Sequence, residues 1–233
     1  SGVSVSGCTA SADAVVKSEG AASWKLEATE SVVEDFESAS GWSTLGGCNV
    51  ALEGTLKTEG SSSLEVENLS TWTPDTQPRG IWKHTVGPFD LSGKLIAFDL
   101  YVPSNANVAG GFGYEYLAQY GFTPTTGFRL ILTSTAGTTW TAHSIWWFGR
   151  NHILPDQWNT LVFDPATFPP ASTAGGGVDL SNVQGFEIDF VPTATVALQF
   201  YVDRFRTLPK TMAAQLNATA GTVDLEADGD TYR

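Results

Sequence analysis

Short segments in which apolar and polar residues alternate run along most of this chain. The clearest is KLIAFDLYVPSN (94–105), where one face would carry Ile96, Phe98, Leu100 and Val102 and the other Ala97, Asp99 and Tyr101. A period of two residues is typical of a β-strand with one buried face. Comparable segments lie at 32–38, 80–86, 111–120, 127–133, 139–149, 158–164, 185–190 and 196–205.

Turn-forming residues separate these segments at short, regular distances. Such spacing without a lasting helical period predicts an all-β fold, an antiparallel β-sandwich or jelly roll. The exception is TMAAQLN (211–217), for which we expect one or two turns of helix.

The N-terminal part of the chain contains an internal repeat. CTASADAVVKSEGAASWKLEAT (8–29) aligns without gaps to CNVALEGTLKTEGSSSLEVENL (48–69), and each copy has a Glu-Gly turn between two strand-like runs. We therefore expect two similar hairpins. If they lie side by side, Cys8 and Cys48 form a disulfide; two unpaired thiols are the alternative. The expected organisation is an additional hairpin packed on the sandwich (1–30), the sandwich itself (31–208) and a polar tail (209–233).

The charge of the chain limits the classes of ligand that it can bind. It has 25 acidic and 12 basic residues, a net charge of −13. Such a chain repels phosphate backbones and anionic polysaccharides, so we expect no nucleic-acid partner. Neutral ligands and divalent cations are compatible with it. No apolar run reaches the roughly 20 residues of a membrane helix, so no membrane partner is expected. The chain opens with SGVSVSG and no basic-then-apolar leader, as expected of a processed secreted protein or an excised domain.

The order of several motifs resembles the β-jelly-roll carbohydrate-binding modules of secreted polysaccharide-degrading enzymes. These motifs are VVEDFESASGW (32–42), EGSSSLEV (59–66), AFDLYVPSN (97–105), WNTLVFD (158–164), DLSNVQGFEIDF (179–190) and FYVDRF (200–205). The resemblance spans about residues 31–207. It implies a secreted, non-catalytic module of a larger multidomain protein, which binds a polysaccharide or oligosaccharide.

The same resemblance implies a structural calcium ion. Asp35 and Glu37 are expected on one strand face, opposite Phe36, and Asp203 lies in the last motif. In the resembling modules, acids at these two places meet at calcium, an ion that takes about six to eight oxygen ligands. Glu59 would add a carboxylate or a carbonyl oxygen. The alternative is a set of surface carboxylates, or an ion pair of Asp203 with Arg204 or Arg206.

A glycan site needs aromatic rings that stack on sugars and planar polar groups that bind hydroxyls. Trp42 and Trp158 are expected to pack in the core, and one of the adjacent Trp146 and Trp147 to face outward. A solvent-facing set including Asp99, Tyr101, Arg129 and Glu187 has the required composition. The full set of candidates is Asp99, Tyr101, Tyr114, Tyr116, Arg129, Trp146, Trp147, Glu187 and Asp189.

GFEIDFVP (185–192) raises the question of catalysis. Phe186, Ile188 and Phe190 would face the core, with Glu187 and Asp189 on the open face. A retaining glycosidase holds two carboxyls about 5 Å apart, and same-face strand neighbours lie roughly 6.6 Å apart. Laminarinase-type hydrolases place a further glutamate where this chain has Pro192-Thr193. We therefore expect no catalytic residue; a jelly-roll glycoside hydrolase, a polysaccharide lyase and a structural surface module are the alternatives.

Overall fold

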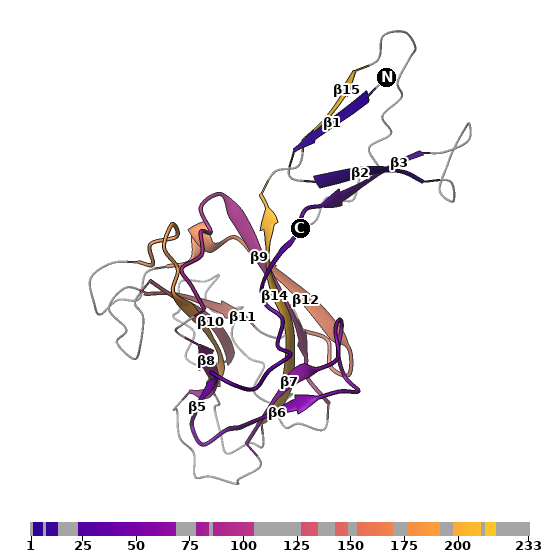
Figure 1. Ribbon diagram of the computed structural model, residues 1–233. Coiled ribbons are helices and arrows are strands. Elements are labelled where there is room, and N and C mark those ends of the chain that lie inside the picture. The colour runs from indigo at the N-terminus through magenta and orange to yellow at the C-terminus, as the bar shows by residue number, and fades with distance from the viewer. Residues whose placement is uncertain are drawn as a thin grey trace. The chain divides into compact units, whose positions relative to one another are not determined.

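The computed structural model divides the chain into two compact units, Ser1–Glu30 with Leu208–Arg233, and Ser31–Thr207 (Figure 1). It describes residues 2–6, 8–13, 23–68, 78–83, 86–104, 127–134, 143–148, 153–169, 177–191, 198–210 and 213–217. Among these residues, no helix has the length and apolar character needed to span a membrane.

The unit Ser31–Thr207 is a sandwich of two antiparallel sheets that face each other (Figure 1). The five-stranded sheet has the order β11 (His143–Phe148), β10 (Gly127–Thr133), β13 (Gly185–Val191), β8 (Arg79–Lys83) and β5 (Ser43–Leu45). The six-stranded sheet has the order β12 (Trp158–Phe163), β9 (Lys94–Tyr101), β14 (Leu198–Pro209), β7 (Ser63–Asn68) and β6 (Asn49–Glu53), and β4 (Ser31–Glu34) pairs with β14. A 3-10 turn, η2 (Pro165–Thr167), follows β12. The predicted all-β sandwich is confirmed.

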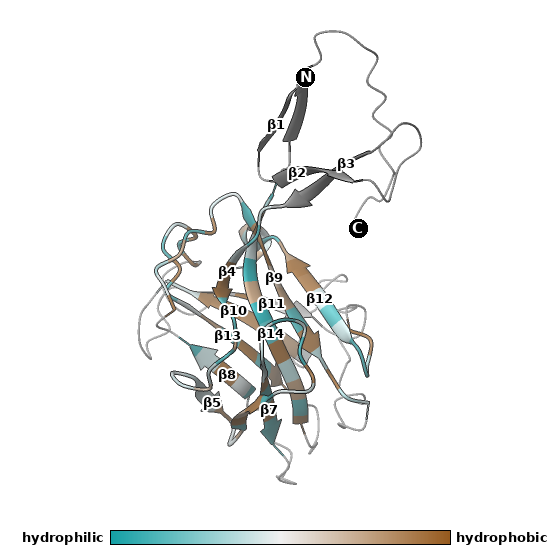
Figure 2. Ribbon diagram, turned by 45° about the vertical axis from the view of Figure 1, so that its right-hand side comes forward, coloured by the Kyte–Doolittle hydropathy of each residue, from teal (hydrophilic) through white to brown (hydrophobic). Residues whose placement is uncertain are grey.

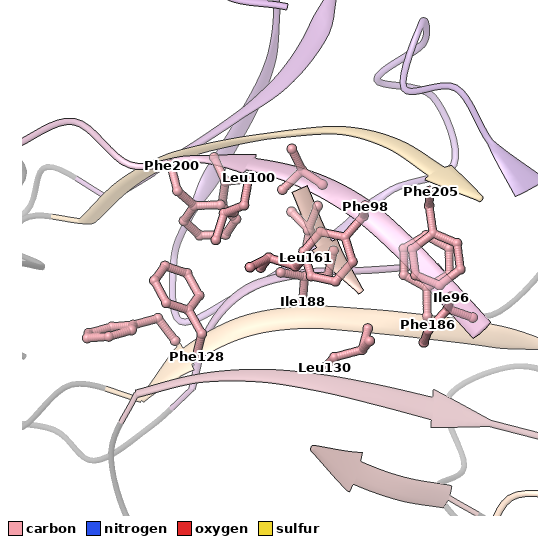
Figure 3. Close-up of a cluster of buried hydrophobic side chains, with 14 of the residues drawn as sticks. Ile96, Phe98, Leu100, Phe128, Leu130, Leu161, Phe186, Ile188, Phe200 and Phe205 are labelled. Atoms are coloured by element: carbon pink, nitrogen blue, oxygen red, sulfur yellow. The ribbon is translucent and has the colours of Figure 1, made fainter. Parts of the chain in front are cut away.

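The core fills the space between the two sheets, as the strand periodicity predicted. Phe98 of β9 and Phe186 of β13 are fully buried, and brown apolar positions alternate with polar ones along the strands (Figure 2). The rings of Phe186 and Phe205 stack with centroids 4.1 Å apart and so join the sheets. Figure 3 shows these side chains with their buried neighbours Ile96, Leu100, Phe128, Leu130, Leu161, Ile188 and Phe200. The outer face of the five-stranded sheet carries the candidate site.

The strands of the two copies of the sequence repeat pair in the same register. In the second unit β6 pairs with β7, and Asn49 lies opposite Glu67. In the first unit β2 (Cys8–Asp13) pairs with β3 (Ser23–Ala28), and Thr9 lies opposite Glu27. The two registers are identical after a shift of 40 residues, since 49 − 9 and 67 − 27 both equal 40. How the two hairpins pack, and with it the expected packing of 1–30 on the sandwich, stays a prediction.

The expected helix at 211–217 is wrong. Residues Ala213–Asn217 form the strand β15, which pairs with β1 (Gly2–Ser6) and places Leu216 opposite Val3. Helix propensity over seven residues is a weak preference, and pairing with a distant strand overrides it.

Candidate functional site

Arg129 lies on the outer face of the five-stranded sheet and is bound to Asp189. The register of β10 and β13 places the two residues directly opposite each other. The guanidinium donates from Nε to Oδ1 over 2.7 Å and from Nη2 to Oδ2, so that the pair is bidentate. Burial lowers the pKa of Arg129, but the hydrogen bonds and the charge of Asp189 raise it overall. Asp189 is fully buried, whereas 15% of the Arg129 side chain is exposed. Arg129 is therefore the part of this pair that a ligand can reach.

Glu187 lies two residues before Asp189 on the same face of β13. Its side chain is 2% exposed, and its Oε1 lies 3.8 Å from Arg129 Nη2. Within the described part of the chain, Glu187 Oε2 is buried without a hydrogen-bond partner. Burial raises the pKa of Glu187 well above its ordinary value, and the hydrogen bond and charge of Asp189 raise it further against the opposing effect of Arg129. A buried carboxyl of this kind is a candidate functional group.

Two residues of β8 complete this surface. The register of β8 and β13 places Trp82 beside Glu187 and Gly80 beside Asp189. The indole of Trp82 is half-buried. A Cβ on Gly80 would lie 2.5 Å from Asp189 Cα, so only glycine allows this close approach. We refer to Trp82, Arg129, Glu187 and Asp189 as the Arg129 cluster. The sequence pattern contained a signal for Trp82, which alternates with the buried Ile81.

The remaining aromatic candidates are only partly described. In β11, Trp147 is the cross-strand neighbour of Arg129, and Trp146 is the neighbour of the buried Leu130. The side chains of both tryptophans lie outside the described residues, as do Tyr114 and Tyr116. Their proposed contacts with a sugar stay predictions.

Asp99 and Tyr101 do not join the Arg129 cluster. Both lie on β9, in the six-stranded sheet, so the expected single surface of Asp99, Tyr101, Arg129 and Glu187 is divided between two sheets. Asp99 is 2% exposed and accepts hydrogen bonds from Arg206 Nη1 over 3.2 Å and from Thr160 Oγ1 over 2.6 Å. Its oxygens therefore link β9 to the neighbouring strands β12 and β14.

Tyr101 belongs to a row of aromatic side chains on that second sheet. Its ring centroid lies 5.7 Å from those of Trp158 and Tyr201, with interplanar angles of 60° and 77°. Rings inclined so steeply pack edge to face and offer no continuous flat surface. The predicted core position of Trp158 is wrong, because Trp158 packs beside Tyr101 on the outer face. Trp42, by contrast, stacks on Phe36 at 5.2 Å and confirms its predicted packing role.

The four acids proposed as calcium ligands line one pocket. Asp35, Glu37, Glu59 and Asp203 surround it together with Val32, Gly60 and Arg204. Asp35 and Glu37 reach this pocket through a different local structure from the one the sequence predicted. The strand β4 ends at Glu34, and Phe36 adopts a left-handed φ of 58° with its ring in the core. Asp35 and Glu37 are therefore placed by a turn around Phe36 and not by a continuous strand face.

Hydrogen-bond donors and one guanidinium of the protein already bind the carboxylates of Glu37, Asp203 and Glu59 in this acid pocket. Ser61 donates its backbone N–H over 2.8 Å and its hydroxyl to Glu37, and these bonds lower the pKa of Glu37 to about 2. Asp203 Oδ2 accepts the backbone N–H of Thr58 over 2.8 Å. Arg204 Nε lies 2.6 Å from Glu59 Oε2. No three histidine, cysteine or acidic side chains are grouped to hold a metal ion anywhere in the described ranges.

Cys48 is buried in the core of the sandwich and has no disulfide partner among the described residues. Its burial raises the pKa of the thiol to about 11, so it stays protonated at neutral pH. The side chain of Cys8 lies outside the described residues, and the disulfide between the two stays a prediction.

No family model and no curated protein sequence matches the chain. Solved structures do. The family 11 carbohydrate-binding module of the cellulosomal cellulase Lic26A-Cel5E of Clostridium thermocellum matches with a TM-score of 0.51 and 18% identity, over 78% of this chain and 95% of that one. A family 11 carbohydrate-binding module from Clostridium thermocellum in complex with a β-1,3-1,4-mixed-linked tetrasaccharide matches with a TM-score of 0.51 and 19% identity, over 77% of this chain and 95% of that one.

A third match is an exo-β-agarase, with a TM-score of 0.50 and 15% identity. It covers 76% of this chain but 25% of the agarase chain, so the sandwich corresponds to one part of a longer enzyme. At these identities the matches establish the fold. They confirm the resemblance to β-sandwich carbohydrate-binding modules that the motif order indicated.

Proposed function

We propose that the unit Ser31–Thr207 is a non-catalytic module that binds a glycan on the outer face of its five-stranded sheet, over the Arg129 cluster. The observation that carries this is the strand register, which brings an indole, a guanidinium and two carboxyls together on one face. An aromatic ring beside planar polar groups is the composition that sugars require. The structural likeness to carbohydrate-binding modules supports the same function.

The contacts of Asp189 favour binding over cleavage. A retaining glycosidase needs one carboxylate free to attack the sugar. Both oxygens of Asp189 are held by Arg129 on a fully buried side chain, which opposes such an attack. The raised pKa of Glu187 is the observation that favours the alternative, a jelly-roll hydrolase or lyase, because a general acid has this property.

Affinity electrophoresis in gels that contain soluble neutral polysaccharides distinguishes these functions. Mixed-linkage β-1,3-1,4-glucan and agarose are the first probes, followed by xylan. We expect retardation by at least one polysaccharide, without new reducing or unsaturated ends after prolonged incubation. Release of oligosaccharides would support the enzyme. A chain that no polysaccharide retards would favour a structural module of a surface protein.

We further propose that the acid pocket holds a structural calcium ion. Its donor set fits the ion in kind, because four carboxylates line the pocket. Gly60 also lines the pocket, and the absence of a side chain there leaves room for the Glu37 carboxylate, because a Cβ would lie 1.7 Å from Glu37 Oε1. Calcium would compete with Arg204 for Glu59 and would neutralise part of the acidic surface.

Removal of calcium is expected to destabilise the module. With free calcium at about ten times its Kd, the ion adds ~1.4 kcal/mol, which corresponds to a Tm roughly 3–6 °C higher than in EDTA. Thermal melts with EDTA and with added calcium measure this shift. Asp203→Asn should abolish the shift, and Glu67→Gln, on β7 outside the pocket, should retain it. Identical melting curves in EDTA and calcium would contradict the proposal.

Secretion and attachment to a larger polysaccharide-degrading protein form part of the same proposal. The share of the agarase chain covered by the match supports such an attachment.

A further inference from the structure

The Arg129 cluster contains two carboxyls and one cation, and the three groups are bound unequally. Arg129 gives both arms of its fork to Asp189, and its nearest approach to Glu187 is the 3.8 Å between Nη2 and Oε1. If all three groups were ionised, a second negative charge would be buried without a hydrogen-bonded cation. Burial of an unpaired charge is costly, and a carboxyl in that position keeps its proton instead.

The groups that face Glu187 come from three strands. On β10 they are Ile131, directly opposite, and Arg129. On its own strand β13 the neighbour is Asp189. On β8 the opposite residue is Trp82; the adjacent Lys83 lies 2.7 Å from Glu34 Oε2 through its Nζ. Among the described residues, Arg129 and Asp189 are thus the charged groups that determine the state of Glu187.

We propose that Glu187 and Asp189 share a single proton and that Glu187 Oε2 accepts a hydrogen bond from a hydroxyl group of a neutral glycan. The inference rests on the proposed function of this face. The shared proton leaves Oε2, which has no partner among the described residues, as a buried carbonyl oxygen. The raised pKa of Glu187, caused by burial and by Asp189, is consistent with this state.

This arrangement defines the class of ligand. One guanidinium, one carboxylate and one neutral acid give the cluster no net charge. The fork of Arg129 is occupied by Asp189, so the cluster offers no uncommitted cation for the carboxylate of a uronic acid. The net charge of −13 acts in the same direction. Sugars that present only hydroxyl groups are therefore selected over polyuronates.

Glu187→Gln and Glu187→Leu test the proposal by calorimetric titration with mixed-linkage β-glucan, or with whichever neutral glycan the gels select. The glutamine amide can donate its N–H to Asp189 and present its carbonyl in the place of Oε2. We expect it to bind with wild-type affinity near pH 6 and with no change up to pH 9. Leucine lacks the acceptor, and this variant should bind about tenfold more weakly than the glutamine variant at every pH.

The wild type should lose affinity as the pH rises through the pKa of Glu187, because the second charge then draws Arg129 away from Asp189. Tenfold weaker binding by Glu187→Gln near pH 6, or a wild-type pH profile in that variant, would overturn the proposal. Polygalacturonate binding as tight as that of the neutral glycan would also overturn it.

Stability supplies a readout that needs no ligand. Folding raises the pKa of Glu187, so its contribution to stability is complete below the unfolded pKa and is lost as the pH rises through the folded one. The unfolding free energy of the wild type should fall over this range relative to Glu187→Gln. Parallel curves would show an ionised Glu187 and overturn the shared proton. If these curves diverge and no glycan binds, the shared proton stands, whereas the proposed function and the role of Oε2 fail.

Discussion

Arg129→Met is expected to lower the unfolding free energy by about 3–5 kcal/mol, because it removes one partner of a buried ion pair. Asp189 has no exposed surface, and both of its oxygens accept from the Arg129 guanidinium. Without that cation, Asp189 must take up a proton or remain as an uncompensated buried charge. Urea denaturation at pH 7, with a common m-value, measures the loss.

The double variant Arg129→Met with Asp189→Leu distinguishes the effect of the unpaired charge from the effect of lost side-chain packing. Replacing both partners with apolar residues removes the unpaired charge, so the double variant should be more stable than Arg129→Met alone. A single variant within about 1 kcal/mol of the wild type would contradict the account, because it would show that the pair is solvated.

Gly80→Ala is expected to cost about 3 kcal/mol, at the upper end of the range for an overpacked site. Its Cβ would lie 2.3 Å from Ile188 O and 2.5 Å from Asp189 Cα, and both are backbone atoms that cannot turn aside. The strands β8 and β13 must therefore separate beneath the Arg129 cluster, so glycan affinity should fall with stability. Thermal and urea unfolding measure the first effect, and titration measures the second.

Gly54→Ala is the matched control, because a Cβ there would make an ordinary contact of 3.7 Å with Ser61 O. It should change the unfolding free energy by less than about 1 kcal/mol. Equal stability of Gly80→Ala and Gly54→Ala would show that the two strands are not held as close as the structure has them.

The period of two residues was sufficient to predict which side chains form the core. Ile96, Phe98 and Leu100 on β9 are all fully buried, as are Phe186 and Ile188 on β13. Alternation determines the two faces of a strand, and burial of one face makes the pattern visible. The predicted core and the all-β class follow from this local signal.

The same period does not determine to which sheet a strand belongs. Asp99 and Arg129 each lie opposite an apolar face, and the sequence therefore placed them on one surface. Chain topology puts β9 and β10 in different sheets, which separates the two residues. Burial of Glu187 and Asp189, expected on an open face, also depends on neighbouring strands that the local pattern does not specify.

The acid pocket was predicted by a different route. Asp35 and Asp203 are far apart in sequence, and the motif order of the resembling modules indicated that they meet. The structure places both in one pocket. The left-handed φ of Phe36 was not predictable, because a large apolar residue rarely adopts it. Here the ring of Phe36 is buried, whereas the flanking Asp35 is exposed and Glu37 is half-buried, so the chain turns at Phe36.

The two outer faces of the sandwich offer a direct test of where a glycan binds. Trp82 lies on the five-stranded sheet beside Glu187, and Trp158 lies on the six-stranded sheet beside Tyr101. Both indoles are half-buried, so the loss of each ring has a comparable effect on the fold. The matched variants Trp82→Ala and Trp158→Ala therefore differ chiefly in the face that they change.

Calorimetric titration of these two variants with the neutral glycan that retards the wild type measures the affinity of each face. We expect Trp82→Ala to bind about tenfold more weakly, a loss of ~1.4 kcal/mol, and Trp158→Ala to bind like the wild type. Wild-type affinity in Trp82→Ala, together with weakened binding in Trp158→Ala, would contradict the account and place the ligand on the opposite sheet.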